Sequence, residues 1–310
     1  MAYAPSTVKN MECHWRLYLS FCDALACPAF PVSVYILTLC VQYLSKRLAS
    51  PGSVKTYVHS VKILHIFMGH PVAQFDSIII SLMYRGIARS MKHFVFQSFP
   101  MSPQILLELY QHLDMSVPID STIWCLFVLS FLCMCRKSNM VPVSTNKFDG
   151  SKQLQRRDVQ VLTSSMLVSI KWSKTRQFGG KKLKIPLFRI PSSPLCPIKS
   201  FKHMSKLVPA HRLAPAFCYY KGKKLLPITY KMYNSRIKSL ISLTGRNPHC
   251  YSTHSFRRGG ASFAFQCQVP GETIKLLGDW SSDAYLQYLH LPMQVRASAA
   301  FTIRDCLSNL

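Results

Sequence analysis

HSFRRGGAS, residues 254–262, places a histidine, two arginines and two glycines within one short stretch. The surrounding pattern is helical, so His254 and Arg257, three positions apart, would share one face of a helix. Ser252 or Thr253 would lie near the N-terminus of that helix, where free backbone amides favour phosphate. The stretch therefore predicts a site that can hold a phosphate group beside a histidine.

A second stretch, GDWSSDAYLQYLHLP at residues 278–292, supplies a tryptophan and two tyrosines. On a helix that begins near Asp283, Tyr285 and Tyr288 lie three positions apart, so their directions differ by only about 60°. Periodicity therefore favours neither tyrosine as a nucleophile. A lone YLQY would be read as two half-buried aromatic residues.

Two further cations lie far upstream. Arg136 ends a buried apolar run in FLCMCRKSNMVP, where an arginine needs an anionic partner or a cleft. Lys174 lies at the end of the first strand of an expected hairpin over residues 160–187, which has a Gly-Gly turn. Other lysines are close to it: Lys171, Lys181, Lys182 and Lys184. Two arginines, a lysine and a histidine around one phosphate would stabilise a pentacovalent transition state, so a tyrosine could attack without a metal.

The charge balance points to a polyanionic partner. The 310 residues include 38 Lys and Arg against 12 Asp and Glu, a formal net charge of +26. Such a surplus fits nucleic acid or an acidic membrane surface. The longest apolar run, residues 122–135, is shorter than the roughly 20 residues of a membrane-spanning helix, and the N-terminus does not resemble a secretory signal. We therefore expect an intracellular protein that binds nucleic acid, without a membrane partner.

Several kinds of chemistry lack their motifs. The twelve cysteines show no zinc-type spacing, so we interpret them as reduced thiols that mostly fill core positions. Neither a phosphate-binding GxxxxGK[ST] loop nor a GxSxG motif is present, and the acidic residues are too scattered for a two-metal site. The sequence predicts no metal and no cofactor.

Helical periodicity runs from residue 6 to about residue 91, and a proline-interrupted linker follows at residues 94–103. Ser33 and Ser102 are expected helix caps. We predict a helical N-terminal domain over residues 1–97 and a second domain over residues 98–310. The basic faces of the first domain suit either a DNA clamp or an ordinary solvated helical bundle.

Four stretches occur in one order: CRKSNMVP, IKWSKTRQFGGKKLKIPL, THSFRRGGASFAF and LLGDWSSDAYLQYL. Together they resemble the active-site boxes of the tyrosine recombinase (phage integrase) superfamily, most closely those of the Crypton and DIRS-like mobile elements. The resemblance covers roughly residues 102–291. It implies a mainly α fold with a small β-sheet or hairpin (α+β), in which a helical core-binding domain precedes the catalytic domain.

The resemblance also implies a role for each matching residue. Two arginines would grip the scissile phosphate, a hairpin lysine would protonate the leaving 5′ oxygen, and a histidine would assist proton transfer. A tryptophan would donate a hydrogen bond to a phosphate oxygen, and a tyrosine would form the 3′-phosphotyrosyl link. In that order the residues are Arg136 and Arg257, Lys174, His254, Trp280 and Tyr288.

The sequence departs from the family pattern in three places. Asn139 replaces an acidic residue that often follows the first arginine, and Asp279 stands as an insertion between Gly278 and the tryptophan. Relatives place the tyrosine nine residues after the tryptophan, which here would be Leu289, whereas Tyr288 lies at eight. A one-residue deletion near residues 281–283 would reconcile the spacing. The position of Tyr288 shortly before Pro292 favours it over Tyr285.

The family further implies a homotetramer on paired sites in double-stranded DNA, with no small-molecule substrate and, for a eukaryotic mobile element, a nuclear location. Two alternatives remain open. A transposon-derived copy could bind DNA without cutting it, and a type IB topoisomerase could use similar groups to relax supercoils.

Overall fold

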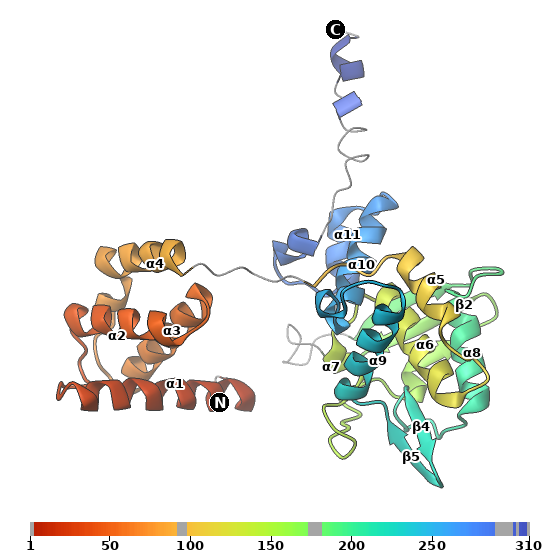
Figure 1. Ribbon diagram of the computed structural model, residues 1–310, viewed down its shortest axis with the longest axis horizontal. Coiled ribbons are helices and arrows are strands. Elements are labelled where there is room, and N and C mark those ends of the chain that lie inside the picture. Colours follow the sequence, from red (N-terminus) through yellow and green to blue (C-terminus); the bar gives the residue numbers. More distant parts are fainter. Residues whose placement is uncertain (1–2, 92–97, 173–181, 289–299, 302–303, 309–310) are drawn as a thin grey trace. The chain divides into compact units, whose positions relative to one another are not determined.

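The structure of the protein is a computed structural model that describes residues 3–91, 98–172, 182–288, 300–301 and 304–308, except for the side chain of Tyr288 (Figure 1). The chain divides into two compact units, residues 1–95 and residues 96–310. The sequence places this division after residue 97.

Unit 1 is helical in its described residues. Its elements are α1 (Pro5–Ala24), α2 (Val34–Arg47), α3 (Pro51–Phe67), the 3-10 helix η1 (Ala73–Asp76) and α4 (Ile78–Ser90). Ser33, Ser50 and Ser77 cap α2, α3 and α4, because each hydroxyl accepts a hydrogen bond from the backbone N–H three residues on. The predicted cap at Ser33 is thus confirmed. The helices enclose an aliphatic core that includes Leu37, Val41, Val54, Val58 and Ile80.

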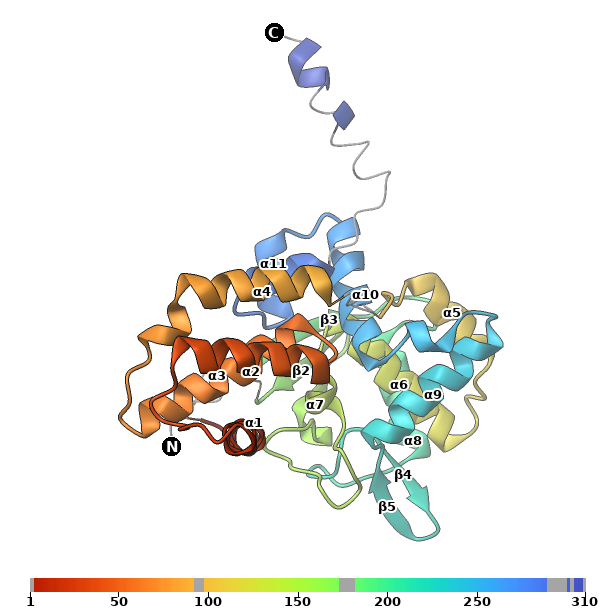
Figure 2. The ribbon, with the colours of Figure 1, turned by 60° about the vertical axis from the view of Figure 1, so that its left-hand side comes forward.

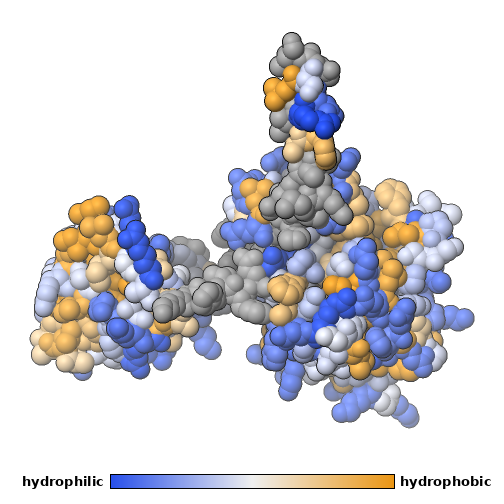
Figure 3. All heavy atoms as spheres, turned by 45° about the horizontal axis from the view of Figure 1, so that its top comes forward, coloured by the Kyte–Doolittle hydropathy of each residue, from blue (hydrophilic) through white to orange (hydrophobic). Residues whose placement is uncertain are grey.

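Part of the surface of unit 1 is apolar, as Figure 3 shows. On α4, the side chains of Ile78, Ile79 and Leu82 are exposed by 68%, 50% and 54%. Adjacent exposed aliphatic residues of this kind are typical of a surface that contacts another chain or domain.

Unit 2 is built around one apolar helix. The helices of its described residues are α5 (Pro103–Gln111), α6 (Pro118–Leu132), α7 (Lys137–Met140), α8 (Pro197–Leu207), α9 (Tyr230–Leu243), α10 (Thr253–Gln266) and α11 (Gly271–Leu277), with 3-10 helices η2 (Arg156–Asp158), η3 (Pro248–Cys250) and η4 (Asp283–Tyr288). Every residue of α6 from Ser121 to Phe131 is buried, and both α8 and α10 pack against it (Figure 2). No helix in the described ranges is long and apolar enough to cross a membrane.

Two small antiparallel sheets complete unit 2. The first has the order β1 (Val159–Val161), β2 (Ser165–Ile170) and β3 (Leu183–Phe188), and the second pairs β4 (Cys218–Lys221) with β5 (Lys224–Pro227). Pairing of β2 with β3 confirms the predicted hairpin, although its Gly-Gly turn lies outside the described residues. The predicted first strand is instead two strands, because a turn at residues 162–164 separates β1 from β2. The predicted mainly α fold with small antiparallel sheets is confirmed.

Two glycines set how closely α10 approaches the rest of unit 2. A Cβ atom on Gly259 would lie 1.8 Å from the Met101 carbonyl oxygen, and one on Gly260 would lie 2.2 Å from the Phe131 carbonyl oxygen. Only hydrogen fits in such gaps, so the backbone of α10 touches both the end of α6 and the segment before α5. This contact places the first turns of α10 beside the residues that follow α6.

Candidate active site

An open pocket of about 390 Å³ in unit 2 brings together Arg136, His254, Arg257 and Trp280. Its remaining lining comes from the neighbours of these residues and from α9: Lys137, Ser138, Tyr230, Ser252 and Thr253. Four of the six residues that the sequence predicts for the site therefore meet at one pocket. Lys174 lies outside the described residues, and for Tyr288 the backbone alone, at the end of η4, is described.

Arg136 lies at the N-cap of α7, just after the turn that ends α6. Its Nη1 donates to Oδ2 of Asp279 at 3.1 Å, and its Nη2 donates to the Asp279 backbone carbonyl at 3.1 Å. The sequence predicts that this arginine needs an anionic partner or a cleft. In the structure Arg136 has both, because it lines the pocket and pairs with a carboxylate.

Asp279 follows the end of α11 directly. Gly278 is the C-cap of α11, and Asp279 follows it with a φ of 54°, the left-handed conformation common just after helices. Its N–H bonds the Leu276 carbonyl at 3.1 Å. Counted from Trp280, Tyr288 is still eight residues on, so the one-residue deletion near residues 281–283 stays a prediction.

Arg257 is almost fully buried, with 3% of its surface exposed. Its Nη1 donates to the Met134 carbonyl at 2.5 Å, and its Cζ lies 3.8 Å from the centre of the Trp280 ring. The close approach allowed by Gly259 and Gly260 makes this possible, since Met134 follows α6 directly. The Trp280 ring therefore packs against the Arg257 guanidinium. A hydrogen bond from Trp280 to a phosphate oxygen stays a prediction.

His254 is on the first turn of α10 at the exposed rim of the pocket, and its backbone N–H donates to Ser252 Oγ at 3.2 Å. Although the residue is exposed, the surrounding protein desolvates its ring and lowers its pKa to about 4. Four positive charges lower this pKa further: Arg257, Arg258, Lys137 and Arg136. The imidazole is therefore neutral at pH 7 and able to accept a proton.

This lowered pKa predicts a pH-dependent stability. Between pH 6.5, the ordinary pKa, and about pH 4 the unfolded chain binds a proton at His254 that the folded chain does not. The free energy of unfolding should therefore decrease as the pH falls through this window. Thermal unfolding from about pH 4.5 to 7.5 should show a smaller decrease in His254→Gln than in the wild type. Identical profiles for the two proteins would contradict a depressed pKa at this residue.

Two contacts hold the end of β2, the strand that precedes Lys174 in the sequence. Asn139 is buried and its side-chain amide donates to the Trp172 carbonyl. Lys171 forms a partly buried ion pair with Asp158, with 2.6 Å between Nζ and Oδ2. Lys171 is one of the nearby lysines that could take the catalytic role predicted for Lys174. Its ion pair with Asp158 instead gives it a structural role.

Tyr285 and Arg258 make contacts within unit 2 and are not among the residues that line the pocket. Tyr285 is 5% exposed, and a Cβ on Gly271 would lie 2.8 Å from its hydroxyl. Arg258 donates to the Ser98 carbonyl at 2.7 Å, which ties the segment before α5 to α10.

Sequence reasoning missed Lys137, which lines the pocket with its Nζ 3.6 Å from the centre of the Tyr230 ring. The available signal was its position next to Arg136.

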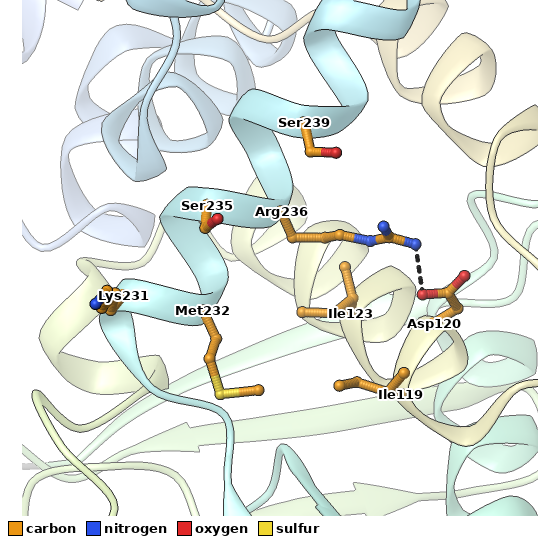
Figure 4. Close-up of a pocket in the computed structure, with 8 residues that line it drawn as sticks. All are labelled: Ile119, Asp120, Ile123, Lys231, Met232, Ser235, Arg236 and Ser239. Atoms are coloured by element: carbon orange, nitrogen blue, oxygen red, sulfur yellow. Dashed lines mark hydrogen bonds and ion pairs between the residues drawn. The ribbon is translucent and has the colours of Figure 1, made fainter.

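A larger pocket, of about 470 Å³, lies between α6 and α9 (Figure 4). Its guanidinium, from Arg236, pairs with Asp120 at 2.6 Å. Two isoleucines, a methionine, two serines and Lys231 line the rest of it. None of the residues that the sequence predicts for the site is among them. Among the described residues, no three His, Cys, Asp or Glu side chains form a group that could hold a metal ion.

The fold of the chain is that of the tyrosine recombinases and integrases, the class to which the similar solved structures belong. Neither a protein-family profile nor a curated protein sequence matches the chain. The likeness therefore rests on three-dimensional structure.

The chain is similar to the Tn1549 transposon integrase in complex with transposon right-end DNA, with a TM-score of 0.63 and 11% identity over 98% of this chain and 95% of that one. It is similar to the XerH site-specific recombinase in a post-cleavage complex with a palindromic difH substrate, with a TM-score of 0.58 and 15% identity over 89% and 73% of the two chains. A lambda integrase dimer bound to a core site gives a TM-score of 0.56 and 13% identity over 93% and 73%.

Proposed function

We propose that the protein is a site-specific DNA recombinase that cleaves and rejoins DNA through a 3′-phosphotyrosyl intermediate. The observation that carries this proposal is the meeting of Arg136, His254 and Arg257 at one open pocket in a chain with this fold. The three residues come from two segments more than a hundred positions apart in the sequence. The fold therefore brings residues that are distant in the sequence to one pocket.

The pocket suggests how the reaction would proceed. Arg136 and Arg257 would contact the non-bridging oxygens of the scissile phosphate and stabilise the charge of the pentacovalent transition state. The Tyr288 hydroxyl would attack phosphorus while its proton passes to the neutral ring of His254. The bond from phosphorus to the 5′ oxygen would break, and Lys174 would supply a proton to that oxygen. The phosphotyrosyl bond would conserve the energy needed for rejoining, so neither ATP nor a metal ion is required.

The distribution of charge supports DNA as the partner. Between Asp158 and Glu272 the sequence contains 20 Lys and Arg and no acidic residue. Hydrophilic residues spread over the visible face of unit 2 in Figure 3. Such a surface favours the closely spaced phosphates of a duplex.

The finer assignments extend this proposal. We assign a core-binding role to unit 1, double-stranded DNA as the partner, and a homotetramer on paired sites as the active assembly. The wording of the four boxes supports an origin in a Crypton or DIRS-like mobile element, and with it a nuclear location.

A nicked suicide duplex tests the function. Cleavage of such a duplex releases a short fragment that diffuses away, so the covalent intermediate accumulates. With a pool of nicked duplexes of randomised sequence, the wild type should form an SDS-resistant adduct. Tyr288→Phe should reduce that adduct by at least about 1000-fold, because the nucleophile is lost. Peptide mapping identifies the modified residue.

Tyr285→Phe is the matched control, since it removes a hydroxyl from a core residue three positions away. It should retain the adduct within about threefold. An adduct mapped to Tyr285 would overturn the assignment of the nucleophile. If no duplex gives an adduct but the wild type still binds DNA, the protein is a binding protein; relaxation of supercoiled plasmid without recombination would indicate a topoisomerase.

A further inference from the structure

The carboxylate of Asp279 forms an ion pair with Arg136, the arginine that the proposed function assigns to the scissile phosphate. The Arg136 guanidinium donates from both terminal nitrogens to this one residue, at 3.1 Å to Oδ2 and 3.1 Å to the backbone carbonyl. The side chain of Asp279 is 11% exposed and that of Arg136 is 26% exposed. The ion pair is therefore partly shielded from water, and it contributes more than a surface pair would.

The backbone holds Asp279 in this place. Its φ of 54° is left-handed, a conformation that glycine, asparagine and aspartate adopt more readily than other residues. The N–H of Trp280 bonds the Lys275 carbonyl at 3.0 Å, which closes the end of α11 around Asp279. The backbone of this turn thus presents the carboxylate to Arg136.

A carboxylate and a phosphodiester are both anions that bind an arginine through paired N–H groups. A phosphate in the pocket would therefore meet Arg136 with two of its nitrogens engaged, and would also face the negative charge of Asp279. Both effects oppose binding of the first phosphate until Arg136 exchanges its partner.

We propose that Asp279 is an internal counter-ion that holds Arg136 in the DNA-free protein and yields it to a phosphodiester of duplex DNA. This inference rests on the proposed function in assigning a phosphodiester to the pocket. Exchange of the ion pair would free the Arg136 guanidinium for the phosphate, while the backbone hydrogen bonds at the end of α11 keep Asp279 in place.

Asp279 and Trp280, two consecutive residues, contact the two arginines of the pocket in different ways. Trp280, the next residue, supports Arg257 through its ring, with 3.8 Å between Cζ and the ring centre. Each arginine of the pocket is thus held by one of two consecutive residues. Arg257 rests on an uncharged ring, whereas Arg136 is held by a charge that a phosphate must replace.

A double-mutant cycle tests this coupling in the full-length protein. Fluorescence anisotropy with a labelled mixed-sequence duplex, at one fixed ionic strength, should show Asp279→Asn binding about fivefold to tenfold more tightly than the wild type. Asparagine keeps the size of the side chain and tolerates the left-handed turn. In an Arg136→Gln background the same substitution should change the affinity by less than about twofold, since no arginine remains to be released.

Asp283→Asn is the matched charge control, because it removes one carboxylate four residues away that pairs with Lys275 at 2.7 Å. It should change the affinity by less than about twofold. An equal gain from Asp279→Asn in the Arg136→Gln background would overturn the proposal, because the effect would then be long-range repulsion. Weaker binding by Asp279→Asn would also overturn it and would make Asp279 a positioning residue for Arg136. These outcomes are read from binding alone, so the absence of a covalent adduct, which would refute the recombinase, leaves them interpretable.

Discussion

Gly260→Ala is expected to destabilise unit 2 by at least about 3 kcal/mol, because a methyl group has no room between α10 and the end of α6. Its Cβ would lie 2.2 Å from the Phe131 carbonyl oxygen and 2.8 Å from the Met134 side chain. The first of these neighbours is backbone, which cannot move aside as a side chain can. Relief requires the two helices to separate, and separation opens the core and moves Arg257 away from the Met134 carbonyl.

Differential scanning calorimetry of the full chain would measure the effect. The transition of unit 2 should fall by about 6–12 °C in Gly260→Ala. Gly86→Ala is the matched control: Gly86 lies within α4, and a Cβ added there would meet no atom within 4 Å beyond the backbone of its own helix. That change should stabilise unit 1 by about 0.5–1 kcal/mol, since alanine favours the helix. A Gly260→Ala transition within about one degree of the wild type would show that α10 and α6 can separate at little cost.

The backbone elements that sequence reasoning locates well are those with strong local signals. Ser102 accepts from the Ile105 N–H and Pro103 opens α5, as their residue types predict. The helix predicted around His254, with Ser252 or Thr253 near its N-terminus, matches α10, which begins at Thr253 and is capped by Ser252. In these places the capping chemistry and the apolar periodicity lie within one element, so no distant contact is needed to specify it.

Other elements carry no such signal. The strands β4 and β5 have four residues each, too few for a period to show, and α8 begins at Pro197 in a segment rich in proline. The residues from Asp283 to Tyr288 form a 3-10 helix in place of the expected α-helix. Short elements of this kind depend on tertiary contacts more than on the propensity of their own residues.

The candidate site was predictable as a set of residue types but not as a network of contacts. The pairing of Arg136 with Asp279 joins residues 143 positions apart, so only the folded chain reveals it. The sequence pattern shows Asp279 only as an extra residue before Trp280, whereas the structure places it in a left-handed turn just after α11. The support of Arg257 by Trp280 is likewise a tertiary contact that no spacing rule contains.

Arg257→Lys is expected to slow formation of the covalent adduct by at least about 100-fold, although it preserves the positive charge. The Arg257 guanidinium donates to the Met134 carbonyl and lies over the Trp280 ring while it lines the pocket. A lysine ammonium is a compact charge without a planar face or a fixed fork of donors, so it cannot keep these contacts together. Single-turnover rates on the suicide duplex would measure the loss.

Arg258→Lys is the same substitution one residue along. Arg258 donates to the Ser98 carbonyl, outside the pocket lining, and a lysine can also donate to a carbonyl oxygen. Its adduct should form within about threefold of the wild-type rate. Equal losses in the two variants would mean that both arginines act through the stability of α10. A large loss confined to Arg257→Lys, with unchanged thermal unfolding, would instead show that the site needs the geometry of a guanidinium held by Trp280 and Met134, since charge is the same in both proteins.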